Sequence, residues 1–318
     1  MKPHGLSASA IFLAPRIVAL ILVSNFYFAG QALARNCTAA EKTGADAQLW
    51  LNKRDKAASL KRHLPWRVPG PAADRILVQR DYVIGYSDAL RVPLWTAHRL
   101  DGSGLGKESR VDCFRADPRI PASAAAQRSD FDEPIFDQGH FSPNGDFSKA
   151  KTPVINSFIL SNMAPQHCQM NRGVWQILES LVRIWATEQG SLYVITGSIF
   201  DQDGDGERDA DSASLRMKSR NGKERVAIPS HFYKVLVREL GDGRVESLAF
   251  MIPNDQTNLD GEAAIEYLEN HLVALDEIEK VTGIGLLPGL TVSELPRPAG
   301  LWTHTKAAAR SLAHNCPP

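Results

Sequence analysis

Short runs of apolar and β-branched residues recur along the chain, separated by turn residues such as glycine, proline and aspartate. The first three runs follow one another closely, which is typical of an antiparallel meander. The later three are continuous apolar stretches, the pattern of buried strands. The six predicted strands cover residues 76–79, 82–86, 93–98, 192–196, 232–237 and 247–252.

Outside these strands the apolar residues change to helical spacing in three segments. Residues 171–186 are predicted to form an amphipathic helix, and residues 263–281 a second helix that is stopped by Gly283. Residues 39–60 are polar and have a weak helical pattern. The apolar positions of the first helix are Val174, Leu178, Leu181, Val182 and Trp185. Strands with a few separated helices predict an α+β fold, with a central antiparallel sheet and flanking helices.

The N-terminal segment has the composition of a signal peptide. Lys2 and Arg16 precede an apolar stretch at residues 17–29, and Ala32-Leu33-Ala34 supplies the small residues that a signal peptidase requires. The stretch is short for a membrane span of ~20 residues, although an uncleaved anchor is the alternative. We therefore expect a signal peptide at residues 1–34, a secreted or periplasmic protein, and no stable membrane association after cleavage.

The rest of the chain divides at a cluster of turn-forming residues and at a later change in the hydrophobic pattern. Prolines and a glycine cluster at residues 65–71, and after Pro296 the chain becomes polar without a clear pattern. The sequence therefore predicts an N-terminal extension at residues 35–72, one domain at residues 73–295, and a C-terminal tail at residues 296–318.

Composition alone leaves the function open. The chain has 43% hydrophobic and 23% charged residues, which is ordinary for a globular protein with one sizeable core. Its 36 basic and 36 acidic residues cancel, so the net basic charge that commonly marks nucleic-acid binding is absent. Any phosphate binding must therefore depend on arginines and lysines placed locally.

The segment from Asp137 to Asp146 contains a candidate general base. His140 follows Gly139, where the backbone can bend sharply and present the ring. An imidazole with an ordinary pKa near ~6.5 accepts a proton from water at physiological pH. Taken alone, a surface histidine in a loop is the alternative interpretation.

A second segment, residues 160–175, contains a candidate metal ligand. Asn171 stands at the start of the predicted helix, and Glu179 follows eight residues later. Mg²⁺ prefers oxygen ligands and often takes only one or two from the protein, so an amide oxygen together with substrate oxygens is sufficient. The alternative for Asn171 is an ordinary helix N-cap, a position that asparagine favours.

Together these motifs resemble the DNA/RNA non-specific endonuclease family, the endonuclease G-like ββα-metal nucleases. The family carries Asp-Arg-Gly-His, then Ser-Asn-x-x-Pro-Gln, then Asn-x-Gly-x-Trp at the start of a helix with a glutamate further along. The matching segments here are residues 137–140, 161–166 and 171–175, followed by Glu179. The resemblance covers residues 76–290. It implies a ββα-metal site on an antiparallel sheet and hydrolysis of DNA and RNA with Mg²⁺, or Mn²⁺, as cofactor.

The resemblance also implies a role for each matching residue. His140 corresponds to the general base, and Asn171 to the only direct protein ligand of the metal. Glu179 corresponds to a carboxylate that holds water around the metal. Asn162 corresponds to a polar residue that orients the site. Arg110 is aligned, to within a residue or so, with an arginine that stabilises the phosphate.

The chain departs from the family pattern at one position. Asp137 is retained, but Gln138 stands where the family has an arginine that can place a positive charge near the scissile phosphate. Because the base and the ligand are both present, we expect an active site with an altered rate. A compensating cation elsewhere, Arg119 or Arg172, is one possibility. A catalytically weak or inactive nucleic-acid-binding member of the same fold is the other reading.

A related class, the His-Asn-His hydrolases, fits the sequence less well. That class needs a second histidine or an acidic ligand on the helix, and residues 172–186 contain no histidine.

An acidic loop at residues 201–211 is a candidate structural calcium site. Its carboxylates and Gly206 fit the spacing of a calcium loop, but Ser212 stands where the usual bidentate glutamate is expected. The candidate ligands are Asp201, Asp203, Asp205 and Asp209. A solvated acidic hairpin tip is the alternative.

The four cysteines lie outside the predicted signal peptide, and an even count in an exported chain indicates disulfides. No CxxC spacing supports a zinc site, and three pairings are possible. Cys113 and Cys168 lie beside the candidate site residues, whereas Cys37 and Cys316 lie at the two ends. We therefore expect the pairs Cys113–Cys168 and Cys37–Cys316.

Overall fold

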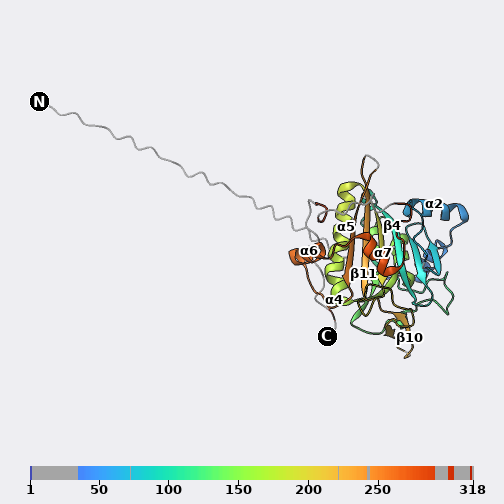
Figure 1. Ribbon diagram of the computed structural model, residues 1–318. Coiled ribbons are helices and arrows are strands. Elements are labelled where there is room, and N and C mark those ends of the chain that lie inside the picture. The colour runs from blue at the N-terminus through green and yellow to red at the C-terminus, as the bar shows by residue number, and fades with distance from the viewer. Residues whose placement is uncertain are drawn as a thin grey trace. The chain divides into compact units, whose positions relative to one another are not determined.

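The computed structural model describes residues 1, 35–71, 73–220, 222–241, 244–290, 300–303 and 316. The predicted signal peptide and most of the predicted tail lie outside the described residues. From Arg35 onward, the described residues belong to one unit, Leu33–Pro318 (Figure 1). Within the described part of the chain, no helix is long and apolar enough to cross a membrane.

A six-stranded antiparallel sheet forms the centre of this unit, so the predicted α+β class is confirmed. The predicted meander is its β2–β3–β4 part, and the three later predicted strands are β8, β11 and β12. In sheet order the strands are β12 (Val245–Pro253), β11 (His231–Glu239), β8 (Ser191–Ile199), β4 (Val92–Asp101), β3 (Val83–Ser87) and β2 (Arg75–Val78).

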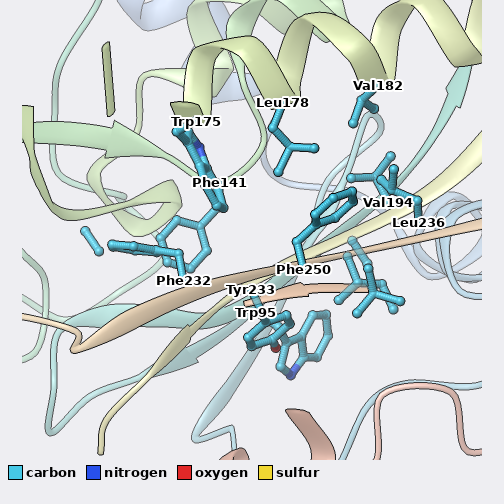
Figure 2. Packing of buried hydrophobic residues seen from close by; sticks show 14 of the residues in the cluster. Trp95, Phe141, Trp175, Leu178, Val182, Val194, Phe232, Tyr233, Leu236 and Phe250 are labelled. Atoms are coloured by element: carbon cyan, nitrogen blue, oxygen red, sulfur yellow. The ribbon is translucent and has the colours of Figure 1, made fainter. Parts of the chain in front are cut away.

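Helix α5 (Gln176–Gln189) covers one face of this sheet. Figure 2 shows Leu178 and Val182 of the helix above Phe250 and Leu236, while Tyr233 lies on the opposite side of its strand. All five side chains are almost completely buried. The side chains of a strand alternate between the two faces, so burial on both faces explains why β11 is a continuous apolar run.

On that second face two aromatic rings lie over glycines of the neighbouring strands. Trp95 is paired with Gly85, and Tyr233 with Gly197. A Cβ atom at Gly85 would come within 2.2 Å of the Trp95 ring, and one at Gly197 within 2.0 Å of the Tyr233 ring. Both glycines are therefore required so that the rings can lie flat on the sheet.

The single helix predicted at residues 263–281 is wrong, because the structure has two. They are α6 (Gly261–Asn270) and α7 (Leu275–Thr282). Between them the backbone pairs with the edge strand: the Met251 N–H donates to the His271 carbonyl, and the Val273 N–H to the Ala249 carbonyl. Pairing with β12 takes the backbone out of the helix, which residue periodicity alone does not reveal.

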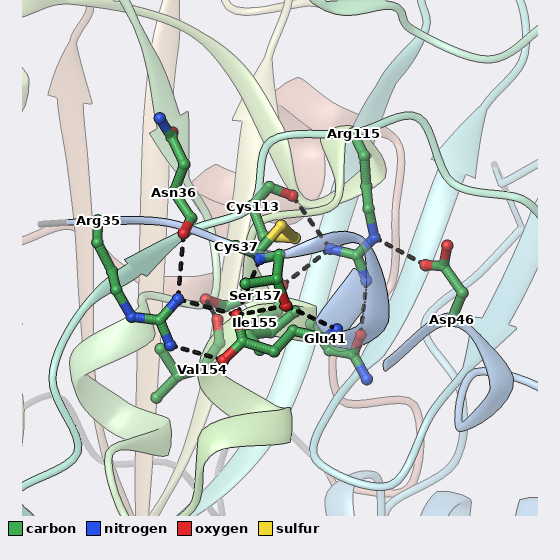
Figure 3. The surroundings of a disulfide bond; sticks show 12 residues. Arg35, Asn36, Cys37, Glu41, Asp46, Cys113, Arg115, Val154, Ile155 and Ser157 are labelled. Carbon is green, nitrogen blue, oxygen red and sulfur yellow. Dashed lines mark hydrogen bonds and ion pairs between the residues drawn. A yellow bond between two sulfur atoms is a disulfide. The ribbon is translucent and has the colours of Figure 1, made fainter. Parts of the chain in front are cut away.

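The N-terminal extension folds against the rest of this unit through α1 (Ala39–Ala47) and α2 (Lys53–His63). The short strands β1 (Arg35–Asn36) and β5 (Val111–Asp112) pair in parallel and bring Cys37 beside Cys113. These two cysteines form a disulfide (Figure 3). The expected Cys37–Cys316 pair is therefore wrong, because strand pairing and not chain position decides the partner.

The second disulfide joins Cys168 to Cys316, so the expected Cys113–Cys168 pair is wrong as well. Cys168 begins the short helix α4 (Cys168–Met170). The tail is also held at Trp302, which is buried and whose carbonyl accepts a hydrogen bond from Trp185 Nε1 of α5 at 2.9 Å. Each disulfide thus fastens a terminal segment to a segment that leads into the candidate site.

A smaller two-stranded ribbon completes the ββα arrangement. Strand β6 (Phe136–His140) pairs in antiparallel fashion with β7 (Met163–His167), and β7 leads into the helical segment that ends with α5. The remaining elements are α3 (Lys151–Ser157), β9 (Arg216–Lys218) and β10 (Glu224–Ala227).

Candidate active site

A cavity of about 630 Å³ lies between the β6–β7 ribbon and α5. Six of the seven residues predicted for the catalytic and Mg²⁺ site line it. They are Arg110, Asp137, Gln138, His140, Asn171 and Glu179. Three segments that are separate in sequence are therefore brought to one place by the fold.

His140 is the last residue of strand β6, not a loop residue. Gly139 before it faces Gln166 of β7, and a Cβ atom at position 139 would lie 1.8 Å from the Gln166 Oε1 atom. Gln166 is fully buried. The glycine of one motif is therefore required by the glutamine of another, and their contact fixes the ribbon that presents the histidine.

The imidazole of His140 lies in apolar surroundings. Its ring centroid is 4.7 Å from that of Phe158, in an edge-on arrangement, and 6.4 Å from that of Phe114. Burial and then the charge of Arg110 lower the pKa of His140 to about 3. Its Nε2 atom has no hydrogen-bond partner among the described residues. The ring is therefore neutral at pH 7 and has a nitrogen that no other described group engages.

Asn162, the seventh predicted residue, is fully buried and does not line the cavity. Its Nδ2 donates to the carbonyls of Ser142 and Ser157 at 2.9 and 2.8 Å, and its Oδ1 accepts from the Ser142 N–H at 3.0 Å. All three bonds are to backbone groups. Asn162 thus fastens the chain that follows His140 and touches nothing inside the cavity.

Asn171 lies in an irregular segment, the π-helical turn Asn171–Trp175 before α5. Its own backbone is helical and it caps no helix with its side chain, so the N-cap alternative is wrong. Its Nδ2 atom donates to Asp137 Oδ2 at 2.8 Å. Because the amide nitrogen is held by this carboxylate, the amide oxygen is the atom left for a ligand. Such π-helical turns are frequent at functional sites.

Asp137 also binds the next residue, Arg172. The Arg172 Nε and Nη2 atoms donate to the two carboxylate oxygens at 2.8 and 2.6 Å, a bidentate pair. The two side chains are 33% and 20% exposed, for Arg172 and Asp137 respectively. One carboxylate of β6 therefore orients two successive side chains of the π-helical turn.

Glu179 lies near the other end of the part of the helical segment that lines the cavity, about two turns beyond Asn171. Burial raises the pKa of Glu179 to about 7, against the opposing charges of Arg183 and Lys234. Arg183 Nη1 lies 4.0 Å from the glutamate and 3.1 Å from Asp146 Oδ1. A helix places residues four apart on one face, so the glutamate and this arginine face the cavity together.

Buried charges lie beneath this end. The Asp146 carboxylate is 3.0 Å from His98 Nε2; burial opposes its ionisation, but His98 and Arg183 outweigh that cost and hold the pKa of Asp146 below its ordinary value. Lys234 of β11 is 1% exposed, and its Nζ donates to Thr196 Oγ1 at 2.6 Å. Burial lowers the pKa of Lys234 to about 8, although Glu179 and Asp146 oppose this.

Sequence reasoning missed three of these groups: Arg183, Asp146 and Lys234. Arg183 follows Glu179 by four residues, so the helical spacing was a usable signal. Asp146 was noted only as the end of the histidine segment. Lys234 stands within a predicted apolar strand, where no local signal marks it as part of a charged cluster.

The donor set fits a hard divalent cation. The cavity offers an oriented amide oxygen at Asn171 and a carboxylate at Glu179, and oxygen atoms of this kind are the preferred ligands of Mg²⁺. Arg110 and Arg183 add positive charge beside them. A cavity with a neutral imidazole, oxygen donors and guanidinium groups is suited to a phosphodiester and a water nucleophile.

The acidic loop is separate from this cavity. Oxygen atoms of Asp201, Asp203 and Asp205 lie within 4.8 Å of one another. Asp201 already accepts hydrogen bonds from the backbone N–H groups of Gly204 and Gly206, at 2.8 and 3.1 Å. Since backbone donors explain this geometry, the calcium hypothesis for the loop stays a prediction.

The fold and the site together define the class of ββα-metal nucleases. Comparison with known proteins agrees. The family model described as DNA/RNA non-specific endonuclease matches residues 63–293. Nuclease C1 of Cunninghamella echinulata var. echinulata is 32% identical over 241 residues, covering 71% of this chain and 88% of that protein. Human mitochondrial endonuclease G is 30% identical over 222 residues, covering 69% and 72%.

A solved structure also has this fold. A chain from the crystal structure of the EndoG/EndoGI complex superposes with a TM-score of 0.63. It is 27% identical, and the match covers 74% of this chain and 94% of that one. The chain belongs to the DNA/RNA non-specific endonuclease family, and the predicted resemblance is confirmed. It is accordingly an enzyme of the endonuclease type.

Proposed function

We propose that this protein is an exported, Mg²⁺-dependent, sugar-non-specific endonuclease that hydrolyses phosphodiester bonds in DNA and RNA. The observation that carries the proposal is the meeting of His140, Asn171 and Glu179 in one cavity. Three arginines line the same cavity, so it can hold an anionic backbone although the whole chain has no net charge. Phosphate contacts carry no sequence information, so a cavity that binds the backbone phosphate is expected to show little sequence preference.

His140 takes the proton from the attacking water. Its imidazole is neutral in the free protein, and an anionic phosphate entering the cavity raises the pKa of His140 toward the range where proton uptake is effective. The Phe158 ring holds the imidazole from the side, so the base does not have to be ordered when substrate binds.

Asn171 would bind the cation directly through the amide that Asp137 fixes, and Glu179 would hold a water molecule of its shell. A bound Mg²⁺, or Mn²⁺, would supply Lewis-acid stabilisation of the charge on the phosphate and the leaving oxygen. Arg110 and Arg183 stabilise the same developing charge from the protein side.

Export is proposed from the N-terminal pattern. The two disulfides support it, because such bonds persist in oxidising compartments outside the cytosol. N-terminal sequencing of protein recovered from the periplasm or the medium tests it: a start near Arg35 is expected, whereas an intact N-terminus on membrane-bound protein would contradict it.

A plasmid-nicking assay tests the activity. The wild-type protein with Mg²⁺ should convert supercoiled plasmid to nicked and linear forms and degrade RNA, and EDTA should stop both reactions. His140→Ala should lose about 10²–10⁴-fold in rate and still bind DNA, whereas the control His271→Ala should remain active. A wild-type protein that binds DNA but cuts neither substrate would support the alternative of an inactive binder.

A further inference from the structure

The position where this chain departs from the family pattern lines the cavity, as does the ion pair of Asp137 and Arg172. Gln138 lines the cavity and is neutral, whereas the family pattern has an arginine there. Its neighbour in the strand, Asp137, forms a bidentate pair with Arg172.

Two arginines were candidates to replace the missing charge, and the structure distinguishes them. The Arg119 side chain is 7% exposed, and its Nε and Nη2 atoms are bound to Asp117 at 2.9 and 2.6 Å. It also donates to the Val78 carbonyl. Arg119 does not line the cavity. This arginine is therefore a buried structural group and is excluded as the replacement.

Arg172 has the opposite surroundings. It lines the cavity together with Gln138, its side chain is one-third exposed overall, and Nε and Nη2 are held by Asp137. A guanidinium held by a bidentate pair has a fixed orientation, and this lowers the entropy lost when it binds a planar or tetrahedral anion. An arginine anchored by a carboxylate at the cavity wall is suited to contact a phosphate oxygen.

We propose that Arg172 supplies the phosphate-binding positive charge that the family places at position 138, so that the charge has moved from the strand to the π-helical turn. Gln138 and Arg172 line the same cavity, so a guanidinium at either position adds positive charge to it. The inference rests on the nuclease function proposed above and concerns its contact with the substrate backbone.

A double-mutant cycle tests the relocation. Wild type, Gln138→Arg, Arg172→Gln and the double variant are compared in plasmid nicking at fixed salt and Mg²⁺. Arg172→Gln should lose about 10–100-fold in kcat, as expected for a charged donor to the phosphate. Gln138→Arg alone should give no gain. In the Arg172→Gln background, however, Gln138→Arg should restore activity about tenfold or more, a coupling typical of residues that share one cavity.

Binding gives a readout that does not depend on catalysis. In the His140→Ala background, affinity for a labelled DNA duplex is measured over a salt series in EDTA. Arg172→Gln should reduce the slope of log K against log salt by about 0.9, the loss of one phosphate contact. The double variant should recover the slope. Arg54→Gln, an exposed arginine of α2, serves as the control and should leave nicking unchanged.

The outcomes separate the two hypotheses. Wild-type activity in Arg172→Gln overturns the relocation, as does a loss that Gln138→Arg fails to restore, since Arg172 would then act only through Asp137 on Asn171. If the wild-type protein binds DNA without nicking it, the proposed function fails, while the salt slope still decides whether Arg172 contacts phosphate. Melting temperatures of all variants within a few degrees of wild type exclude unfolding as the cause.

Discussion

The two ends of the helical segment that lines the cavity hold the same kind of group, carboxylates with a guanidinium, in different surroundings. At one end Asp137 and Arg172 are 20% and 33% exposed. At the other, Arg183 bridges Glu179 and Asp146, which are 15% and 3% exposed. We refer to these as the Asp137 end and the Glu179 end.

The two ends differ in the free-energy cost of moving or removing a charged side chain. Partly exposed charges are screened by water and cost little to shift, so the Asp137 end can carry its arginine at position 172 instead of 138. At the Glu179 end, Lys234 is almost fully buried beneath the two carboxylates. Removing one member of a buried charge group leaves another uncompensated at a high cost. We therefore expect the Asp137 end to tolerate rearrangement and the Glu179 end to resist it.

The largest effect is expected where the Asp137 end holds the cation. Asn171→Ala removes the amide oxygen that Asp137 orients, so activity at fixed Mg²⁺ should fall by more than about 100-fold. Loss of a group that only supports a metal ligand typically costs about 10–100-fold. Nicking rates over an Mg²⁺ titration measure this. Asn144→Ala, which lines the same cavity, is the matched control. Restoration of the wild-type rate by excess Mg²⁺ would show that Asn171 is not essential to the site.

The next effect is on stability at the Glu179 end. The folded protein holds the Glu179 proton more tightly than the unfolded chain, because burial raises the pKa from 4.5 to about 7. Its contribution is therefore full below about pH 4.5 and is lost as the pH rises through about 7. The rise in the pKa corresponds to about 3 kcal/mol of folding free energy, at ~1.4 kcal/mol per pKa unit.

Glu179→Gln removes this titration. In EDTA, the free energy of unfolding of the variant relative to wild type should increase between pH 5 and pH 8, as measured by urea unfolding. The exposed Glu262→Gln in α6 should show no such trend. A constant difference in the free energy of unfolding across this pH range would mean that burial does not raise the pKa of Glu179.

A smaller, related effect concerns the cation. Because a protonated Glu179 has lost the negative charge that attracts the cation and its bound water, the Mg²⁺ concentration for half-maximal nicking by wild type should increase as the pH falls below about 7. Glu179→Gln should need about 10–100-fold more Mg²⁺, with the dependence on pH lost. Asp137→Asn should keep that dependence. Identical pH profiles for the two variants would remove the proposed distinction between the ends.

Much of the candidate site followed from sequence because its residues lie in short, ordered motifs. Asp137 to His140 occupy successive positions of one strand, and Asn171 and Glu179 lie in one helical segment. The family resemblance carried by these short motifs was therefore sufficient to select them, whereas each residue alone left an ordinary structural role open. The six strands were also predictable, because the alternation and length of apolar runs follow from local geometry. Gln166 and Gly139 both stand in the motifs that carry the resemblance, but their contact across the ribbon was not predicted.

What only the tertiary structure decided depends on residues far apart in sequence. The pairing of β1 with β5 chose Cys113 as the partner of Cys37, and pairing of residues 271–273 with β12 divided a predicted helix in two. Lys234 entered the site because β11 lies under α5, and Arg172 was distinguished from Arg119 by which carboxylate each one meets. Local periodicity reports which face of an element is buried, whereas the partner across that face is set by packing between elements.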